Sequence, residues 1–219
     1  MTDQGRDEAS ARATGASLAA IVLIAGAFAA IMLLHLLRTD LDPVREVMSA
    51  YANGSFGPVM TGAFYALGIA ALLMAFRLLR ATHRTMISRS VVVLLAVSGM
   101  GLIVAGVFEV ELPEIPDTME EVVHSDAALG AFVLLIAAML LFTLVCRADP
   151  RWRGFSLPAI ALAAIATVAA GLSPIADKTP LSGVAQRLLG ATVFAWLLLL
   201  ALRIRFHPAH RPLPDQEPA

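Results

Sequence analysis

The chain has 219 residues, of which 58 % are hydrophobic and 15 % charged, with a formal net charge of −1. Soluble proteins are about 25 % charged, so this composition indicates a membrane protein with several spans and argues against nucleic acid as a partner. The single cysteine, Cys146, cannot form an intramolecular disulfide. Sixteen basic residues include one lysine. The preference for arginine over lysine, together with the abundant alanine, fits a bacterial protein from a GC-rich genome.

Six segments are long and apolar enough to cross a bilayer, since a span needs roughly 20 mainly apolar residues. They are 17–38, 57–79, 90–108, 125–145, 155–175 and 183–202. No acid lies in the middle of a span, and small residues occur throughout, as is typical of closely packed membrane helices. We therefore expect an all-α fold, with a six-helix bundle over 17–205, a disordered tail at 1–16 and a proline-rich tail at 206–219.

The connection between the first two spans carries the signals of a short amphipathic helix at 43–52. Asp42 can cap it, Pro43 suits its first position, and Asn53-Gly54 can end it. Its apolar stripe has helical spacing and consists of Val44, Val47, Met48 and Tyr51. About ten residues cannot span a bilayer, so we expect this helix to lie in the interface. It is either a simple connector or a lid over a polar site.

Arginine and lysine predict the orientation, because cytoplasmic loops carry an excess of them. With the N-terminus inside, twelve basic residues lie on the inner side, and four, namely Arg38, Arg45, Lys178 and Arg187, lie on the outer side. We therefore place both termini in the cytoplasm of a multi-pass protein of the bacterial inner or plasma membrane.

Several polar residues fall near the predicted outer ends of the spans. Thr118 and Glu121 form a capping-box pair, which predicts that the fourth helix begins near Met119. We expect His124 and Arg187 to reach a common outward-facing cavity, with an acid of the 109–121 region close to the arginine. The candidate ligand-binding residues are His35, Asp42, Ser49, Tyr51, Glu109, Glu111, Gln186 and Arg187.

Each of these residues also has a structural explanation. A histidine at a helix end is commonly a hydrogen-bonded interfacial residue, and Arg187 can extend toward headgroups. His124 and Glu120 have the spacing of a metal pair, but any acidic helix start produces it. The sequence has no phosphate loop, nucleophile elbow, Cys-x-x-Cys or His-Glu-x-x-His motif. The spans also lack the central acids that are typical of ion-coupled transporters.

The pattern resembles the bacterial integral membrane family called domain of unknown function 998, over about residues 31–202. The matching residues are His35, Asp42-Pro43, Ser49, Tyr51, Gly54, Gly57, Gly101, Gly106-Val107-Phe108, His124 and Gln186-Arg187. In that family, proline and aspartate tend to follow the position of Phe108, whereas this chain has Glu109 and Glu111. The resemblance implies a six-helix integral membrane protein and no particular reaction.

Three classes of function stay open. The first is a shallow polar pocket on the extracytoplasmic side that binds a lipid or small amphipathic molecule. The second is a membrane-embedded hydrolase or transferase for a lipid or lipid-linked substrate, with His124 and Arg187 as the catalytic candidates and His124 as base or metal ligand. The third is a b-type haem protein with His35 and His124 as axial ligands. Membrane lipids are the expected partners, and the cofactor, the metal content and a homo-oligomeric or membrane-protein partner stay open.

Overall fold

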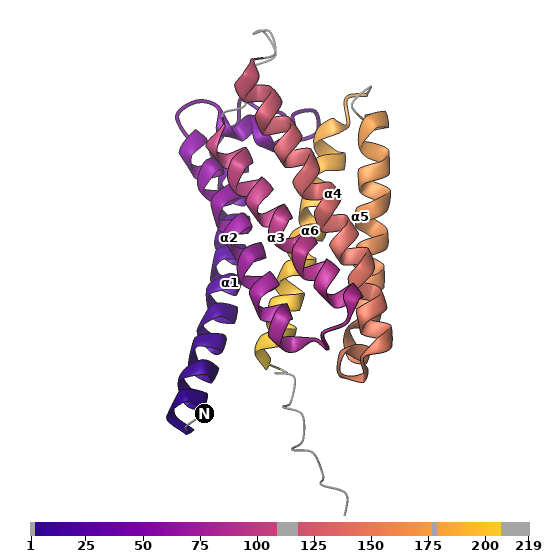
Figure 1. Cartoon of the computed structure of the whole chain (residues 1–219). Coiled ribbons are helices and arrows are strands. Elements are labelled where there is room, and N and C mark those ends of the chain that lie inside the picture. Colours follow the sequence, from indigo (N-terminus) through magenta and orange to yellow (C-terminus); the bar gives the residue numbers. More distant parts are fainter. Residues whose placement is uncertain (1–2, 109–117, 177–178, 207–219) are drawn as a thin grey trace, which may run out of the picture.

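A computed structural model describes residues 3–108, 118–176 and 179–206 (Figure 1). All the long elements of this part are helices. They are α1 (Asp3–Leu37), α2 (Gly57–Ala81), α3 (Met86–Val107), α4 (Met119–Ala148), α5 (Ser156–Ala176) and α6 (Ser182–Phe206). Two short 3₁₀ helices, η1 (Met48–Ala52) and η2 (Pro150–Phe155), lie in the connections.

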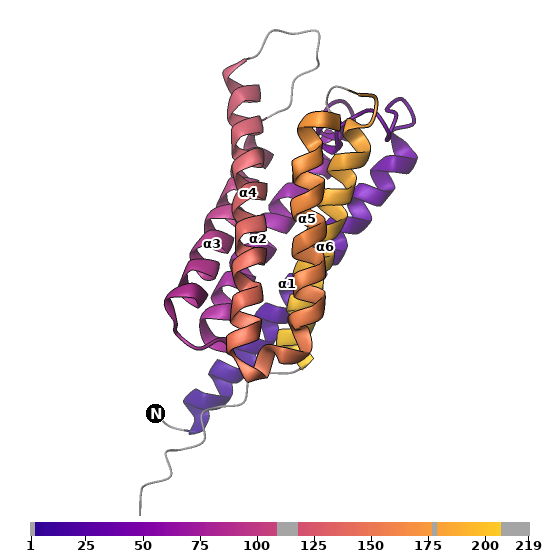
Figure 2. The same ribbon diagram turned by 90° about the vertical axis from the view of Figure 1, so that its right-hand side faces the viewer.

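The six helices form one bundle in which each helix packs against the next one along the chain, and α6 returns to pack against α1 (Figures 1 and 2). The short connections 82–85 and 149–155 favour this arrangement, because they leave the helices that they join as antiparallel neighbours. Six helices of the described chain are long and apolar enough to cross a membrane. The predicted all-α fold with six membrane helices is therefore confirmed.

The outer surface of the bundle is apolar over much of its length. On α5, the side chains of Leu157 and Val168 are 78 % and 60 % exposed. Large apolar patches of this kind are rare on soluble monomers, but they cost nothing against lipid tails. The backbone polar groups of each span are satisfied within its own helix, as the hydrocarbon region requires.

Small residues allow α2 and α3 to approach closely. A Cβ atom added at Gly68 of α2 would lie 2.7 Å from the carbonyl oxygen of Gly99 on α3, and one added at Gly99 would lie 2.7 Å from the oxygen of Gly68. The two backbones therefore touch at this crossing, as at other small-residue contacts in membranes. Beside it, the Ser98 hydroxyl donates a 2.9 Å hydrogen bond to the carbonyl of Ala131 and joins α3 to α4.

The start of α4 follows its sequence signal. The Thr118 hydroxyl accepts a hydrogen bond of 3.3 Å from the amide of Glu121, and the helix begins at Met119 as predicted. Its 30 residues extend about 45 Å, compared with about 30 Å for the hydrocarbon core of a bilayer. The first turns of α4 rise above the neighbouring helices in Figure 2.

The connection between α1 and α2, residues 39–56, differs from the helix predicted at 43–52. Asp42 does cap a turn, since its carboxylate accepts a 2.8 Å hydrogen bond from the amide of Val44. Val47 is then extended, and only Met48–Ala52 forms a helix, of the 3₁₀ type. The α-helix does not continue because the amide of Met48 donates to the Gln186 side chain of α6 instead of to a backbone carbonyl. Gly54 has the expected positive φ of 79°.

The opposite end of the bundle is closed by η2, which connects α4 to α5. The Asp149 carboxylate is buried and accepts hydrogen bonds from the Arg151 side chain at 2.7 and 3.0 Å. The ring of Phe142 makes edge-to-face contacts with Trp152 at 5.0 Å and with Trp196 at 5.9 Å between centroids. These contacts fix the end of the bundle that lies away from the 39–56 segment.

Candidate functional site

A cavity of 410 Å³ lies at the end of the bundle where the 39–56 segment crosses it. Volumes of about 300–1,000 Å³ are typical of small-molecule sites. The lining comes from η1 and four helices, and it consists of Val47, Met48, Ser49, Met60, Phe64, His124, Ser125, Asp126, Ala128, Leu129, Phe132, Ser173, Ser182, Gln186 and Leu189. Hydroxyl, amide, imidazole and carboxylate groups thus share this space with apolar side chains.

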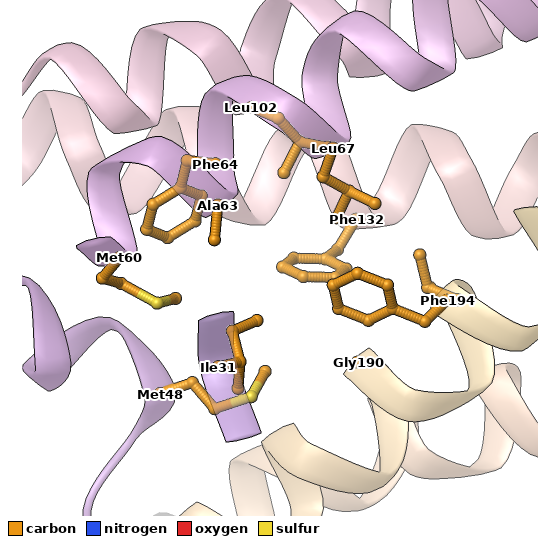
Figure 3. Close-up of a pocket in the computed structure, with 11 residues that line it drawn as sticks. Ile31, Met48, Met60, Ala63, Phe64, Leu67, Leu102, Phe132, Gly190 and Phe194 are labelled. Atoms are coloured by element: carbon orange, nitrogen blue, oxygen red, sulfur yellow. The ribbon is translucent and has the colours of Figure 1, made fainter. Parts of the chain in front are cut away.

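A smaller apolar pocket of 30 Å³ adjoins the cavity on its bundle side (Figure 3). The two spaces share four lining residues, Met48, Met60, Phe64 and Phe132. The deeper residues are Ile31, Ala63, Leu67, Leu102, Gly190, Val193 and Phe194, from α1, α2, α3 and α6. In Figure 3, the side chains of Met60, Phe132 and Phe194 point into this space from three different helices. The site therefore runs from a partly polar mouth to an entirely apolar interior.

His124 is the buried polar residue of the cavity wall. It is 3 % exposed, and its ring lies edge-to-face on Phe64, with 5.5 Å between centroids. Its Nδ1 lies 2.7 Å from the carbonyl oxygen of Ala105 and 3.1 Å from that of Phe108. Both partners are acceptors, so Nδ1 carries a proton, and in the neutral ring Nε2 is then an acceptor. Nε2 has no hydrogen-bond partner among the described residues.

A second polar cluster surrounds Arg187 on the other side of α6. The guanidinium donates to Nε2 of His35 at 2.8 Å, to the carbonyl of Glu46 at 2.6 Å and to the hydroxyl of Tyr51 at 3.2 Å. It also donates to the carbonyl of Gly183 one turn back at 3.1 Å. Its carbon lies 5.5 Å from the centre of the Tyr51 ring, within cation–π range. Arg187 therefore joins α1, α6 and the 39–56 segment.

His35 uses both of its ring nitrogens in this cluster. Nδ1 lies 2.7 Å from the carbonyl oxygen of Ile31, and Nε2 accepts from Arg187. The ring is therefore in the neutral form with its proton on Nδ1. To serve as a haem ligand, His35 would have to release Arg187.

Further bonds attach the 39–56 segment to the start of α6. The Ser182 hydroxyl donates to the carbonyl of Arg45, and the amide of Val184 donates to the carbonyl of Val44 at 3.3 Å. A Cβ atom added at Gly183 would lie 2.5 Å from the carbonyl oxygen of Glu46, so only glycine fits here without a shift of the backbone. The segment thus takes part in these contacts mainly through its own main-chain groups, whereas α6 contributes both side-chain and main-chain groups.

The segment is also attached to α1 at its other end. Arg38 binds the Asp40 carboxylate at 2.8 Å and donates to the carbonyl of Asn53. The hydrogen bond from Arg38 holds the pKa of Asp40 below its usual value, because it stabilises the ionised carboxylate. Among the predicted site residues, Asp42 acts in this segment as the cap of the turn described above.

The structure separates the two residues that were expected to share a cavity. His124 lines the cavity together with Ser49 and Gln186, whereas Arg187 is not among the lining residues. The reason is helical geometry: consecutive residues lie about 100° apart around a helix, so Gln186 faces the cavity and Arg187 faces α1. The expected acidic partner of Arg187 is replaced, among the described residues, by His35, Tyr51 and carbonyl groups.

Other expectations concern residues around the cavity mouth. Glu109 and Glu111 lie outside the described residues. The described part of the chain contains no group of three histidine, cysteine or acidic residues that could hold a metal ion, so Glu120 and His124 gain no third ligand there. Sequence reasoning missed Asp126, which lines the cavity with Ser125. Their position directly after His124, at the start of a predicted span, was the available signal.

The chain was compared with family models, with curated proteins and with solved structures. A family model described as "Protein of unknown function (DUF998)" matches residues 9–203, which is most of the chain. No curated protein and no solved structure matches.

Proposed function

The chain belongs to the DUF998 family of proteins of unknown function, and we propose that it binds one small amphipathic molecule in the cavity beneath the 39–56 segment. The head of this ligand donates a hydrogen bond to Nε2 of His124, and an apolar part of the ligand lies against Phe64, Phe132 and Phe194. The observation that carries the proposal is that His124, whose buried Nε2 has no partner among the described residues, belongs to the lining of a cavity with an apolar interior.

The unpaired nitrogen determines the hydrogen-bonding character of the ligand. A buried acceptor without a partner costs about 1–3 kcal/mol. A ligand hydroxyl, amide or ammonium group that donates to Nε2 recovers much of this energy, whereas an acceptor-only head does not. The hydroxyl groups of the cavity wall can accept or donate, so they fit the same polyhydroxylated or amine-bearing heads.

The charge of the cavity lining determines which ligand head groups bind weakly. Asp126 is the acidic residue of the described lining, and no arginine or lysine is part of it. The nearby Arg187 donates to four protein acceptors around it. A phosphate head in this cavity would therefore meet a carboxylate and no cation, and the two negative charges would repel each other. We infer that the head is uncharged or cationic.

The proposed orientation places this cavity on the extracytoplasmic side of a bacterial cell membrane. The support is the distribution of twelve inner against four outer basic residues. Arg80, Arg84, Arg89 and Arg153 belong to the helix ends and connections away from the cavity. A ligand would then enter from the outer leaflet or from the outer aqueous phase.

Direct binding tests the proposal. The purified protein in mild detergent is titrated with monooleoylglycerol, which has a hydroxyl head, with sphingosine, which has an ammonium head, and with oleoyl lysophosphatidate, and complexes are counted by native mass spectrometry. We expect the first two to bind one per chain. The phosphate lipid should bind at least about tenfold more weakly, which corresponds to about 1.4 kcal/mol.

Two variant pairs locate the site. Ala63→Leu fills the apolar interior and should abolish binding, whereas Ala164→Leu, which faces outward on α5, should not. His124→Phe removes the acceptor, and His124→Gln retains one and should restore part of the affinity. Equal binding by Ala63→Leu and Ala164→Leu, or a preference for lysophosphatidate, would contradict the proposed site.

A second candidate function is hydrolysis or group transfer on such a ligand, because a histidine in a cavity lining, with one ring nitrogen that has no partner among the described residues, can also serve as a general base. The cavity wall holds serine hydroxyls as well, including Ser49 and Ser125. The same titration tests this candidate: release of oleate or glycerol from monooleoylglycerol, lost in His124→Gln, would indicate an enzyme. An intact probe after prolonged incubation would support binding alone.

A further inference from the structure

A basic groove lies at the opposite end of the bundle, between the end of α2 and the start of α3. Its volume is 540 Å³, and its lining consists of Phe76, Leu79, Arg80, Thr82, Arg84, Ser88, Arg89, Val92 and Val93. None of the residues that form this groove lines the cavity described above. It is a separate feature on the surface of the same molecule.

Three guanidinium groups surround this groove without a counter-charge. The guanidinium groups of Arg80, Arg84 and Arg89 have no hydrogen bond or ion pair with a described residue, and the lining contains no acid. Arg80 lies over the ring of Phe76, with 4.3 Å from its carbon to the ring centre. These three exposed arginines line one groove, and an anion bound among them would offset the repulsion between their charges.

The acid of the neighbouring loop is already engaged elsewhere. Asp149 lies 4.0 Å from His83, which belongs to the loop between α2 and α3, but its carboxylate is bound at 2.7 Å by Arg151. The hydroxyl groups of the groove are also in use, since Thr82 donates to Leu78 and Ser88 donates to His83. The arginines are therefore the groups available to a ligand.

The rest of the lining is apolar and exposed. Phe76 is 43 % exposed, Leu79 45 % and Val93 58 %, and all three lie on membrane-spanning helices. A free phosphate ion would use the arginines and leave this apolar part uncovered. A phospholipid uses both, because its acyl chains continue along the helices from the phosphate.

We propose that this groove binds the head of an anionic phospholipid, with the phosphate between Arg80, Arg84 and Arg89 and the acyl chains against Phe76, Leu79 and Val93. Arginine suits this role, because its planar fork binds phosphate oxygens in pairs. The site does not depend on the ligand proposed for the cavity beneath the 39–56 segment. In the proposed orientation it faces the cytoplasmic leaflet, where anionic lipids are enriched.

The test measures lipid selection. The protein is reconstituted into phosphatidylcholine nanodiscs that contain a minor fraction of phosphatidylglycerol, and the lipid that remains bound after transfer to detergent is identified by native mass spectrometry. The wild type should retain phosphatidylglycerol. Each arginine near an anionic headgroup contributes about fivefold to the affinity, so the triple variant Arg80→Gln, Arg84→Gln, Arg89→Gln should lose about a hundredfold.

The matched control removes three arginines from other places at the same end, through Arg147→Gln, Arg153→Gln and Arg205→Gln. It should retain most of the bound phosphatidylglycerol. An equal loss in the control would mean that only net charge matters and would overturn the site. So would complete displacement of phosphatidylglycerol from the wild type by a low concentration of inorganic phosphate, because the apolar part of the groove would then contribute nothing to binding. If the triple variant does not fold, the single change at the exposed Arg84 should still weaken binding about fivefold.

Discussion

Arg187→Met is expected to loosen the 39–56 segment without unfolding the bundle. The guanidinium donates to the carbonyl of Glu46 at 2.6 Å and to the hydroxyl of Tyr51 at 3.2 Å, and both acceptors belong to this segment. It also donates to His35 of α1 at 2.8 Å. Methionine retains most of the side-chain volume but has no hydrogen-bond donor and no charge, so the variant removes the hydrogen bonds together with the cation–π contact to Tyr51.

The magnitude follows from the two bonds that hold the segment directly. A hydrogen bond from a charged donor contributes about 1.5–3 kcal/mol, and the lower value applies here because Arg187 is half-buried and water can replace part of the loss. The two bonds together then contribute about 3 kcal/mol, which corresponds to roughly a hundredfold in the equilibrium for local opening. The bonds from Ser182, Gln186 and Val184 remain and keep the segment attached.

Hydrogen exchange measures this opening directly. Amides in residues 44–56 of Arg187→Met should exchange roughly a hundredfold faster than in the wild type, while those in the middle of α2 and α3 should be unchanged. Arg45→Met is the matched control on the same segment. Arg45 is 67 % exposed and lies 3.4 Å from Asp42. An exposed pair contributes at most about 1 kcal/mol, so exchange should change little.

Arg187→Lys tests whether the attachment of the segment needs the several donors of the planar guanidinium group or only a positive charge. A lysine ammonium is a single point of attachment and cannot reach His35, Glu46 and Tyr51 together, so this variant should behave like Arg187→Met. Wild-type exchange in Arg187→Lys would refute the reasoning from hydrogen-bond geometry. Faster exchange throughout the bundle in Arg187→Met would show instead that the arginine supports the whole fold.

Three further predictions concern other parts of the molecule. Gly183→Ala should shift the 39–56 segment, because its new Cβ would lie 2.5 Å from the carbonyl oxygen of Glu46. Gly62→Ala should not, because a Cβ atom there would have nothing within 4 Å. Crosslinking between engineered cysteines, one in the segment and one at the start of α6, measures the shift. Burial opposes ionisation of Asp149, but hydrogen bonds from its neighbouring arginine outweigh it and lower the pKa below 3.8. The stability that this carboxylate contributes is therefore present above pH 3.8 and lost as the pH falls through the native pKa. The difference in melting temperature between the wild type and Asp149→Asn should shrink on acidification. A difference that stays constant with pH would contradict this. A cysteine at position 84, in a chain without the native cysteine, should not react with an impermeant thiol reagent added outside intact cells, and labelling there would reverse the proposed topology.

The six membrane helices could be predicted from the sequence, because the cost of burying an unpaired backbone group in hydrocarbon applies to each span separately. A run of about 20 apolar residues satisfies this condition without reference to its neighbours. The start of α4 at Met119 and the positive φ of Gly54 were predicted for the same reason, since a cap and a left-handed glycine are local.

The 39–56 segment shows where local signals fail. The spacing of Val44, Val47, Met48 and Tyr51 predicted an α-helix, but a hydrogen bond between the amide of Met48 and Gln186 limits the helix to Met48–Ala52. The donor and the acceptor of this bond are 138 residues apart in the sequence. Local propensity is worth tenths of a kcal/mol per residue, so one long-range bond of this kind can outweigh it.

The candidate site also combines properties that the local sequence determines with properties that depend on tertiary packing. The sequence by itself determined the depth of His35, His124, Gln186 and Arg187, because depth follows from the position of a residue within its span. Only the tertiary structure decided which residues meet, since this depends on the rotation of each helix about its own axis. That rotation is settled when all six helices pack. It turned His124 and Gln186 toward the cavity and Arg187 toward His35, so residues at one level of the membrane belong to two different clusters.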